Sequence, residues 1–281
     1  MIQDILPLQF NNHYEEKEIR EEDYVLAYDG ARVLVKNNQE NLEFLTYGEC
    51  TRKEKEDYIY LFSIDTKQFF LYDTCKGAIV ENEIADMGEW VTMQQIRTCY
   101  PKEAVFAVVT AYHLYVWYQN NRYCGKCGEK TTHDKKERML FCNCCHNMIY
   151  PKIAPAVIVA AKKRNKIFLN KYANRTYKRY ALIAGFTEIG ETVEETVKRE
   201  VMEEVGLQVK NIQYYKSQPW GFDSNLLLGF FCDVAEEQEI TLDQEELACA
   251  EWVDREDIPE YKEGLSLTHE MMLVFKNGLE G

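Results

Sequence analysis

Two groups of residues in this sequence have types and spacings that can do chemistry. The first lies in the run from Gly185 to Leu207, where Glu200, Glu203 and Glu204 stand at positions i, i+3 and i+4. On a helix these positions share one face, so the three carboxylates repel one another unless cations sit among them. Oxygen ligands of this kind suit Mg²⁺ or Mn²⁺, with phosphate oxygens completing the shell. The pattern therefore predicts a divalent metal site, whereas a lone Glu-Glu pair would indicate only a solvated acidic face.

The flanking residues predict how this helix begins and ends. Thr192 and Glu195 match a capping box, and Gly206 offers a left-handed C-terminal cap. A buried stripe is expected from valines four residues apart, namely Val193, Val197, Val201 and Val205. We expect Arg199 to pair with Glu191, two turns earlier, and to hold the preceding loop.

The second group is five of the ten cysteines, which fall within 22 residues. Cys124 and Cys127 form one CxxC pair, and Cys142 and Cys145 form another after a 14-residue spacer. This is the spacing of a zinc ribbon, in which four thiolates close a tetrahedral structural site with no open position. Cys144 is an alternative ligand, but it would break the second CxxC spacing. A redox CxxC is a weaker interpretation, because no thioredoxin-like pattern surrounds it.

The elements around these groups indicate three parts. Residues 1–118 read as short strands and turns, with a hairpin at Asp29-Gly30 and a buried helix over Lys102–Tyr118. After the cysteines, strands are interspersed with helices, which indicates a mixed α/β domain. The strands are expected at Ala154–Lys162, Ile167–Lys171, Tyr180–Ala184, Ile212–Lys216 and Leu226–Val234, and a terminal helix at about Leu265–Asn277. We predict an α+β chain with an accessory β-rich domain at 1–118, a ribbon at 119–151 and the mixed domain at 152–281.

Length, composition and charge narrow the class of protein. The 281 residues are 46% hydrophobic, which fits about two folded domains. No apolar run reaches the ~18–20 residues of a membrane span, and the first ten residues do not resemble a secretory signal. A cytoplasmic protein without a membrane partner is therefore expected. The net charge of −14 argues against a chain-wide nucleic-acid surface, yet residues 122–180 carry fifteen basic and three acidic side chains. The overall charge therefore does not argue against a polyanionic ligand.

The complete glutamate run reads G-x5-E-x7-R-E-U-x-E-E-x-G-U, where U is aliphatic, and it resembles the Nudix box. The resemblance implies a Nudix α/β/α sandwich with a mixed sheet, and metal-assisted attack of water on a pyrophosphate phosphorus. It further implies that Glu200 and Glu204 are metal ligands and that Glu203 is a ligand or a base-assisting carboxylate. The backbone carbonyl of Ala184 is implied as a metal contact. Which glutamate deprotonates the catalytic water stays open.

A second motif narrows the resemblance. Ser217 to Asn225 reads S-Q-P-W-G-F-D-S-N and looks like the S-Q-P-W-P-F-P-x-S motif of the NADH pyrophosphatase (NAD diphosphatase, NudC-type) family. Together with the ribbon and the Nudix box, the resemblance covers nearly the whole chain and is strongest from Cys124 onward. Gly221 and Asp223 replace prolines of the motif, which bears on loop rigidity and substrate preference.

The family resemblance also implies residues that contact the nucleotide. Phe186 and Tyr150 would sandwich the nicotinamide ring. Glu246, with Glu245 as the alternative register, would be a further metal ligand. The other implied contacts are Glu137, Ser217, Gln218, Trp220, Phe222, Ser224, Asn225 and Thr268. Core packing is the alternative for Trp220 and Phe222. The family is homodimeric, and its motif loop reaches across the dimer. The resemblance therefore implies a homodimer, in which Trp220 could contribute to the site of the neighbouring subunit.

Taken together, these features predict hydrolysis of NADH or NAD⁺ to nicotinamide mononucleotide and AMP, and the family implies NAD-capped RNA as a larger substrate. The expected cofactors are structural Zn²⁺ and catalytic Mg²⁺ or Mn²⁺. One alternative is a broader dinucleotide or ADP-ribose hydrolase. A second is a non-catalytic Nudix nucleotide-binding regulator, which would tolerate loss of the glutamates. A third is a nucleic-acid-binding ribbon with a secondary Nudix domain.

Overall fold

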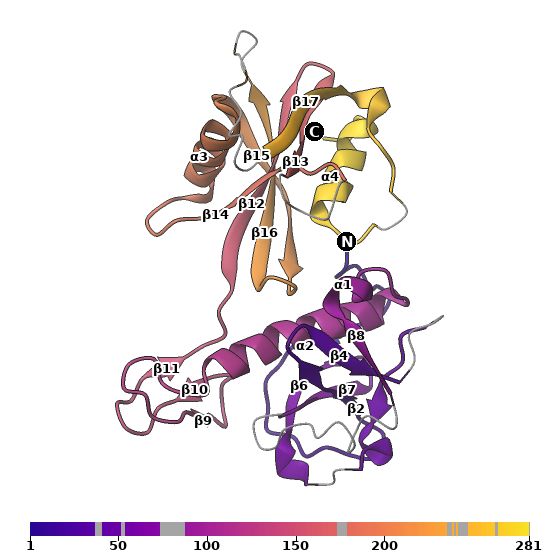
Figure 1. The fold of residues 1–281 in the computed structure, drawn as a ribbon, viewed down its shortest axis with the longest axis vertical. Coiled ribbons are helices and arrows are strands. Elements are labelled where there is room, and N and C mark those ends of the chain that lie inside the picture. Colours follow the sequence, from indigo (N-terminus) through magenta and orange to yellow (C-terminus); the bar gives the residue numbers. More distant parts are fainter. Residues whose placement is uncertain are drawn as a thin grey trace. The chain divides into compact units, whose positions relative to one another are not determined.

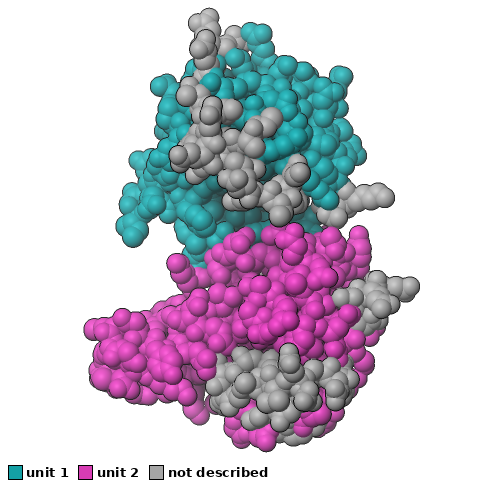
Figure 2. Space-filling model, viewed as in Figure 1, with its two compact units in different colours: residues 1, 153–220, 225–281 teal, residues 2–152, 221–224 magenta. Residues whose placement is uncertain are grey.

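The chain forms two compact units, which Figure 2 distinguishes by colour. The computed structural model describes residues 1–36, 41–51, 54–73, 88–172, 179–234, 238, 240, 247–261 and 264–280. One unit contains residues 1, 153–220 and 225–281, and the other contains residues 2–152 and 221–224. No helix within these described ranges is long and apolar enough to cross a membrane.

A six-stranded sheet is the centre of the first unit (Figure 1). Its strands are β12 (Ala154–Lys163), β13 (Lys166–Tyr172), β14 (Ile183–Phe186), β15 (Val209–Trp220), β16 (Asn225–Val234) and β17 (Leu247–Asp254). They run in the order β15-β16-β12-β13-β17, and β14 pairs with β12. The β12–β16 pair is parallel and the other pairs are antiparallel, so the sheet is mixed, as predicted.

Two helices cover the two faces of this sheet (Figure 1). Alternate residues of β12 point to opposite faces. Ala156, Ile158 and Ala160 enter a core with α4 (Leu267–Lys276), and Val157, Val159 and Ala161 enter a core with α3 (Val193–Val205). Burial on both faces explains why β12 reads as a nearly continuous apolar run. The predicted α/β/α sandwich is confirmed. A short 3₁₀ helix, η4 (Arg255–Asp257), follows β17.

Among its described residues, the second unit contains three small sheets, one of them in the cysteine segment, and a long helix. A five-stranded sheet has the order β1-β6-β7-β2-β5, and a three-stranded sheet has the order β3-β4-β8. Their strands are β1 (Phe10–Asn11), β2 (Tyr24–Leu26), β3 (Tyr28–Asp29), β4 (Arg32–Val35), β5 (Leu45–Thr46), β6 (Tyr58–Ile64), β7 (Lys67–Tyr72) and β8 (Glu89–Thr92). The helices are η1 (Tyr47–Glu49), η2 (Lys55–Asp57), α1 (Met93–Ile96) and α2 (Lys102–Asn120). The predicted β-rich character and the predicted buried helix are both confirmed.

One strand lies later in the chain than expected. The sequence predicted a strand over Tyr180–Ala184, where the alternation of apolar and polar residues stops. In the structure β14 continues through Gly185 and Phe186, which pair with Val157 and Ala156 of β12. The expected start of this strand is reduced to a single bridge between Ala181 and Asn170.

Candidate functional site

The four cysteines of the two CxxC pairs come together in the second unit. Their sulfurs all lie within 4.8 Å of one another, with Cys124 3.5 Å from Cys145 and Cys127 3.4 Å from Cys142. Zn–S bonds of ~2.3 Å in a tetrahedron place sulfurs about 3.8 Å apart, so the group fits a metal ion closely. Cys144 is exposed and lies outside the group, which confirms the choice of Cys142 and Cys145.

The turns that carry these cysteines are built alike. The amide of Gly128 donates to the carbonyl of Cys124 at 2.8 Å, and the amide of His146 donates to the carbonyl of Cys142 at 2.9 Å. Both donors have positive φ, at 81° and 57°. Three short strands, β9 (Thr132–His133), β10 (Leu140–Phe141) and β11 (Met148–Ile149), join the turns. A hydrogen bond from the Lys126 amide lowers the pKa of Cys124 to about 6, which favours the thiolate that binds metal.

Helix α3 presents the glutamates, and its two ends form as the sequence predicts. The Thr192 side chain accepts from the amide of Glu195, and the Glu195 side chain accepts from the amide of Thr192. Gly206 closes the helix with φ of 70° in the left-handed region. The stripe of Val197, Val201 and Val205 is fully buried against the sheet. This buried stripe leaves the glutamate face of α3 turned toward β14.

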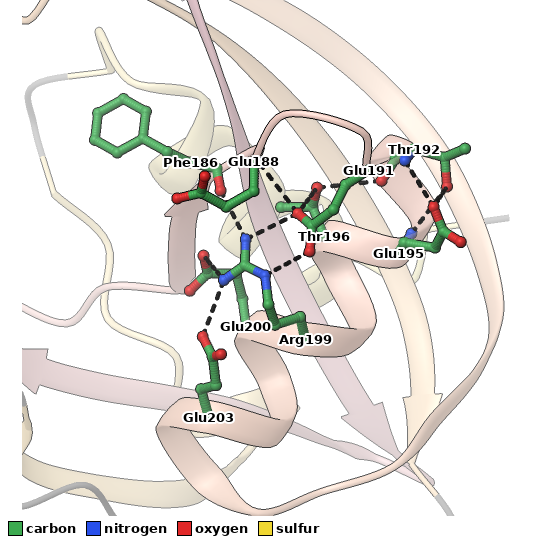
Figure 3. Close-up of polar contacts among 9 residues, drawn as sticks. All are labelled: Phe186, Glu188, Glu191, Thr192, Glu195, Thr196, Arg199, Glu200 and Glu203. Carbon is green, nitrogen blue, oxygen red and sulfur yellow. Dashed lines mark hydrogen bonds and ion pairs between the residues drawn. The ribbon is translucent and has the colours of Figure 1, made fainter.

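Arg199 is the centre of a hydrogen-bond network on this face (Figure 3). Its guanidinium donates twice to Glu191, at 2.6 and 3.0 Å, and once to the carbonyl of Phe186 at 2.8 Å. The two bonds to Glu191 confirm the predicted Arg199–Glu191 pair, and they lower the pKa of the Glu191 carboxyl to about 2. The same guanidinium reaches Glu200 at 2.8 Å and Glu203 at 2.9 Å. Arg199 therefore fastens the loop after β14 to the middle of α3.

The three glutamates have graded environments. Glu204 is 2% exposed and accepts a hydrogen bond from Asn170 at 3.2 Å. The side chain of Glu200 is 12% exposed, and that of Glu203 is 59% exposed. Among the described residues, the four cysteines place their ligand atoms within 4.8 Å of one another and the three glutamates do not, and one nitrogen of Arg199 contacts both Glu200 and Glu203. The helix spacing places the three carboxylates on one face of α3, but their oxygens do not form a compact group of ligand atoms.

Gly185 shapes the space that Glu200 occupies. A Cβ built on Gly185 would lie 1.9 Å from the carboxyl carbon of Glu200, so the carboxylate lies directly against the backbone of β14. Ala184, whose carbonyl is the implied metal contact, is the preceding residue of the same strand and pairs with Ile158. Carboxylate and carbonyl oxygens are the hard ligands that Mg²⁺ and Mn²⁺ take, so this cradle fits such an ion.

The structure gives Gln218 a different role from the ligand contact that the sequence predicted. Gln218 is fully buried on β15, where its amide donates to the carbonyl of Leu265 and accepts from the amide of Leu267, both at 2.7 Å. Both ends of the amide thus hold the backbone where α4 begins. Thr268, a predicted nicotinamide contact, lies in the first turn of that helix, directly after Leu267.

The other motif residues on β15 and β16 differ in burial and in their contacts. Ser217 pairs with Leu228 in the β15–β16 ladder, and Trp220 packs against the core below α4. Asn225 is 8% exposed, and its Oδ1 has no hydrogen-bond partner among the residues that the structure describes. A buried amide oxygen in this state suits a ligand or a water as its partner. In the first unit, Trp220 packs against the core, as the core-packing alternative for this residue expected.

The four residues that connect β15 to β16 group with the second unit. A Cβ on Gly221 would lie 2.3 Å from the carbonyl oxygen of Val109 on α2, so only glycine fits there. This close approach accounts for the replacement of the motif proline. The ring of Phe222, a predicted wall of the nucleotide site, lies 4.6 Å from the guanidinium of Arg97 in a cation–π contact. Ser224 completes the turn with φ of 58°.

Two predicted nucleotide contacts in the second unit contact each other. The hydroxyl of Tyr150 donates to Glu137 at 2.7 Å, and this bond raises the pKa of Tyr150. Both Tyr150 and Phe186 are about half exposed. Phe186 belongs to the first unit, and its pairing with Tyr150 around a nicotinamide ring stays a prediction. Glu246 and its alternative Glu245 lie outside the described residues.

Sequence reasoning did not identify Asn170 as part of this region. It stands in the run Ile-Phe-Leu-Asn of β13, where a polar residue interrupts a buried strand. That interruption is the signal that would have found it, since a buried amide needs a polar partner.

Comparison with known proteins places this geometry in context. The family model of the NUDIX domain matches residues 151–272. A curated relative, the NAD-capped RNA hydrolase NudC of Klebsiella pneumoniae subsp. pneumoniae, is 40% identical over 143 residues, which cover 51% of this chain and 55% of the relative. The protein of the same name from Escherichia coli O1:K1 is 39% identical over the same length, again covering 51% and 55%. The chain thus aligns with about half the length of the curated relatives it matches.

A solved structure, that of a NUDIX hydrolase from Nitrosomonas europaea, covers 57% of this chain and 93% of its own, with 21% identity and a TM-score of 0.49.

Proposed function

We propose, from the premise that residues 151–272 are a Nudix domain, that the protein is a metal-dependent pyrophosphohydrolase acting on NADH or NAD⁺. The products would be nicotinamide mononucleotide, in its reduced or oxidised form, and AMP. The observation that carries this proposal is the arrangement of α3 against β14, where Glu200 fills the space left by Gly185. The printed names of the curated relatives, NAD-capped RNA hydrolases, support the dinucleotide as substrate.

Each residue of the glutamate face has a part in the proposed reaction. Glu200 and Glu204, with the carbonyl of Ala184, would hold Mg²⁺ or Mn²⁺. A bound divalent cation supplies activation of water and neutralises charge on the pyrophosphate. Glu203 is the most exposed of the three carboxylates, so solvent reaches it most easily. Arg199 keeps the loop from Phe186 to Glu191 against the helix, which fixes one wall of the site.

The cysteine group would bind structural Zn²⁺. Four thiolates leave no open coordination position, so such an ion stabilises the fold of its own segment without taking part in hydrolysis. The buried Cys124 and Cys142 and the matched turns support this role.

The proposed nucleotide contacts follow from the family resemblance. Phe186 and Tyr150 would bind the nicotinamide ring, Glu137 and Asn225 would contact the nucleotide, and Glu246 would add a metal ligand. The remaining proposed contacts are Ser217, Trp220, Phe222, Ser224 and Thr268. The basic island of residues 122–180 supports an RNA 5′ end as a larger substrate. A homodimer in the cytoplasm is part of the same proposal, tested by sedimentation at several concentrations and by cell fractionation.

A substrate comparison tests the proposal. Purified zinc-loaded protein is incubated with Mg²⁺ or Mn²⁺ and with NADH, NAD⁺, ADP-ribose or NAD-capped RNA, and AMP and nicotinamide mononucleotide are quantified by chromatography. We expect the dinucleotides to give equimolar amounts of both products. Faster turnover of ADP-ribose than of NADH would replace the substrate assignment with the broader hydrolase. Absence of turnover with every substrate would favour a nucleotide-binding regulator.

A further inference from the structure

Asn170 is a fully buried polar residue in an otherwise apolar stretch of β13. Side chains alternate along a strand, so Asn170 shares a face with Phe168, which lies in the core beside α3. Ile167 and Leu169 point the other way, into the core beside α4. The amide of Asn170 is therefore directed to the layer that carries the glutamates.

A hydrogen bond joins Asn170 to the most buried glutamate. Nδ2 of Asn170 donates to Oε2 of Glu204 at 3.2 Å, and both residues are buried. An ionised carboxylate only accepts hydrogen bonds, so the amide must turn its nitrogen toward Glu204 and its oxygen away. That oxygen, Oδ1, is buried and has no hydrogen-bond partner among the described residues.

This arrangement has a cost that a packing role does not explain. An amide oxygen buried without a partner loses its hydrogen bonds to water. A leucine, which has the same branching and the same number of side-chain heavy atoms, would avoid that loss. What Asn170 supplies in return is a directed donor to Glu204, so its contribution lies in the orientation of that carboxylate.

The backbone of Asn170 is fixed by a neighbouring segment. Its amide donates to the carbonyl of Ala181 at 3.0 Å, and its carbonyl accepts from the amide of Ala181 at 2.8 Å. On the other side it pairs with Ala250 of β17. Ala181 lies three residues before Ala184, whose carbonyl is a proposed metal contact. One residue therefore holds Glu204 by its side chain and the approach to Ala184 by its backbone.

We propose that Asn170 is a positioning residue for the catalytic cation, holding the Glu204 carboxylate in its binding orientation before the cation arrives. The inference rests on the proposed function, because it takes Glu204 as a metal ligand. Partners that orient metal-binding side chains typically contribute 10–100-fold in metal affinity. A donor on a rigid strand, rather than on a loop, is suited to that task.

Direct Mn²⁺ binding tests this proposal without relying on turnover. Zinc-loaded full-length protein is titrated with Mn²⁺, and free Mn²⁺ is measured by electron paramagnetic resonance. We expect N170L to raise the dissociation constant for Mn²⁺ by about 10–100-fold. The control is L169A, which loses core contacts from the opposite face of the same strand. It should unfold at a lower temperature and bind Mn²⁺ as the wild type does. Thermal unfolding verifies that each variant is folded. If N170L does not fold, N170A, which also removes the donor to Glu204, is titrated with the same expected result.

A double-mutant cycle separates positioning from a general structural effect. E204Q should weaken Mn²⁺ binding, and adding N170L to E204Q should produce no further loss. An equal loss from N170L in both backgrounds, or no loss in either, would overturn the role of Asn170 while leaving the metal assignment of Glu204 intact. Wild-type Mn²⁺ binding by E204Q would instead contradict the proposed function at Glu204, and the role of Asn170 with it.

Discussion

In the cysteine group, every candidate ligand comes from two tight turns within 22 residues, and the four sulfurs already lie within 4.8 Å of one another. In the glutamate helix, the carboxylates share a face but depend on Gly185 of β14, Arg199 of α3 and Asn170 of β13 for their environments. Each tight turn sets the positions of two cysteines relative to each other within a few residues. The helix sets only which way its glutamates point, and residues on other elements set what those carboxylates contact. The cysteine site is formed within one short segment, whereas the glutamate site also needs residues from strands β13 and β14.

The largest expected effect concerns the cysteine group. Structural zinc sites contribute about 10–16 kcal/mol of apparent binding free energy in small peptides, and the short strands β9 to β11 offer little core to replace it. Cys142→Ser should therefore abolish stoichiometric zinc and unfold residues 119–151, measured by elemental analysis and amide hydrogen exchange. Cys144→Ser is the matched control, since Cys144 is exposed and lies outside the group. Equal zinc loss in both variants would contradict the assignment of Cys142, and not Cys144, as a zinc ligand.

Glu204→Gln should act on the other site alone. The substitution keeps the shape of a buried side chain but removes the negative charge that a cation needs, so turnover of NADH should fall by about 100-fold or more. Zinc content and the circular dichroism spectrum should stay those of the wild type. Retained turnover would remove Glu204 from the metal site, and lost zinc would show that the two regions are not independent.

Gly185→Ala tests whether the glutamate site depends on the sheet. The new methyl group would enter the space of the Glu200 carboxylate, which must then move. Displacing a reacting group by about 1 Å can cost about 100-fold in rate, so turnover should drop without removal of any carboxylate. The thermal unfolding temperature should change little, because the displaced atoms are the flexible end of a side chain. A wild-type rate would show that Glu200 does not need its place against β14.

The smallest expected effect is the pH dependence of the loop before α3. Hydrogen bonds from Arg199 lower the pKa of Glu191 to about 2, from an ordinary value near 4.5. The stabilisation from this pair is therefore fully present above about pH 4.5 and is lost as the pH falls from there through about 2. Hydrogen exchange of the loop amides in this window should show acid loosening in the wild type and none in Glu191→Gln. Glu194→Gln, at an exposed position in the first turn of α3, controls for the lost charge and should behave as the wild type does.

The features of both regions that could be predicted from the sequence are those set by residues close together in the chain. The cysteine spacing predicted the four sulfurs that come together, and the capping box, the valine stripe and Gly206 predicted the ends and the buried face of α3. These signals are local, and each one involves residues close in the chain. The close approach of Gly185 to Glu200 was not predicted, because Glu200 lies on a helix fifteen residues later in the chain.

Other parts of the site could not be predicted for a similar reason. Gln218 looked like a ligand contact within its motif, but its partners, Leu265 and Leu267, are more than forty residues away. Gly221 departs from the motif because it approaches Val109, more than a hundred residues earlier. No periodicity or spacing records such contacts, which arise only when the strands and helices pack.

In the proposed function, hydrolysis takes place at the glutamate site, and the cysteine site is structural. This assignment is tested most directly by titrating Mg²⁺ or Mn²⁺ into protein whose zinc content is held at one ion per chain, and by following AMP and reduced nicotinamide mononucleotide from NADH. We expect the rate of NADH hydrolysis to rise from baseline to saturation while the zinc content does not change. Full turnover before any Mg²⁺ or Mn²⁺ is added, or no turnover at any concentration of either ion, would contradict this assignment.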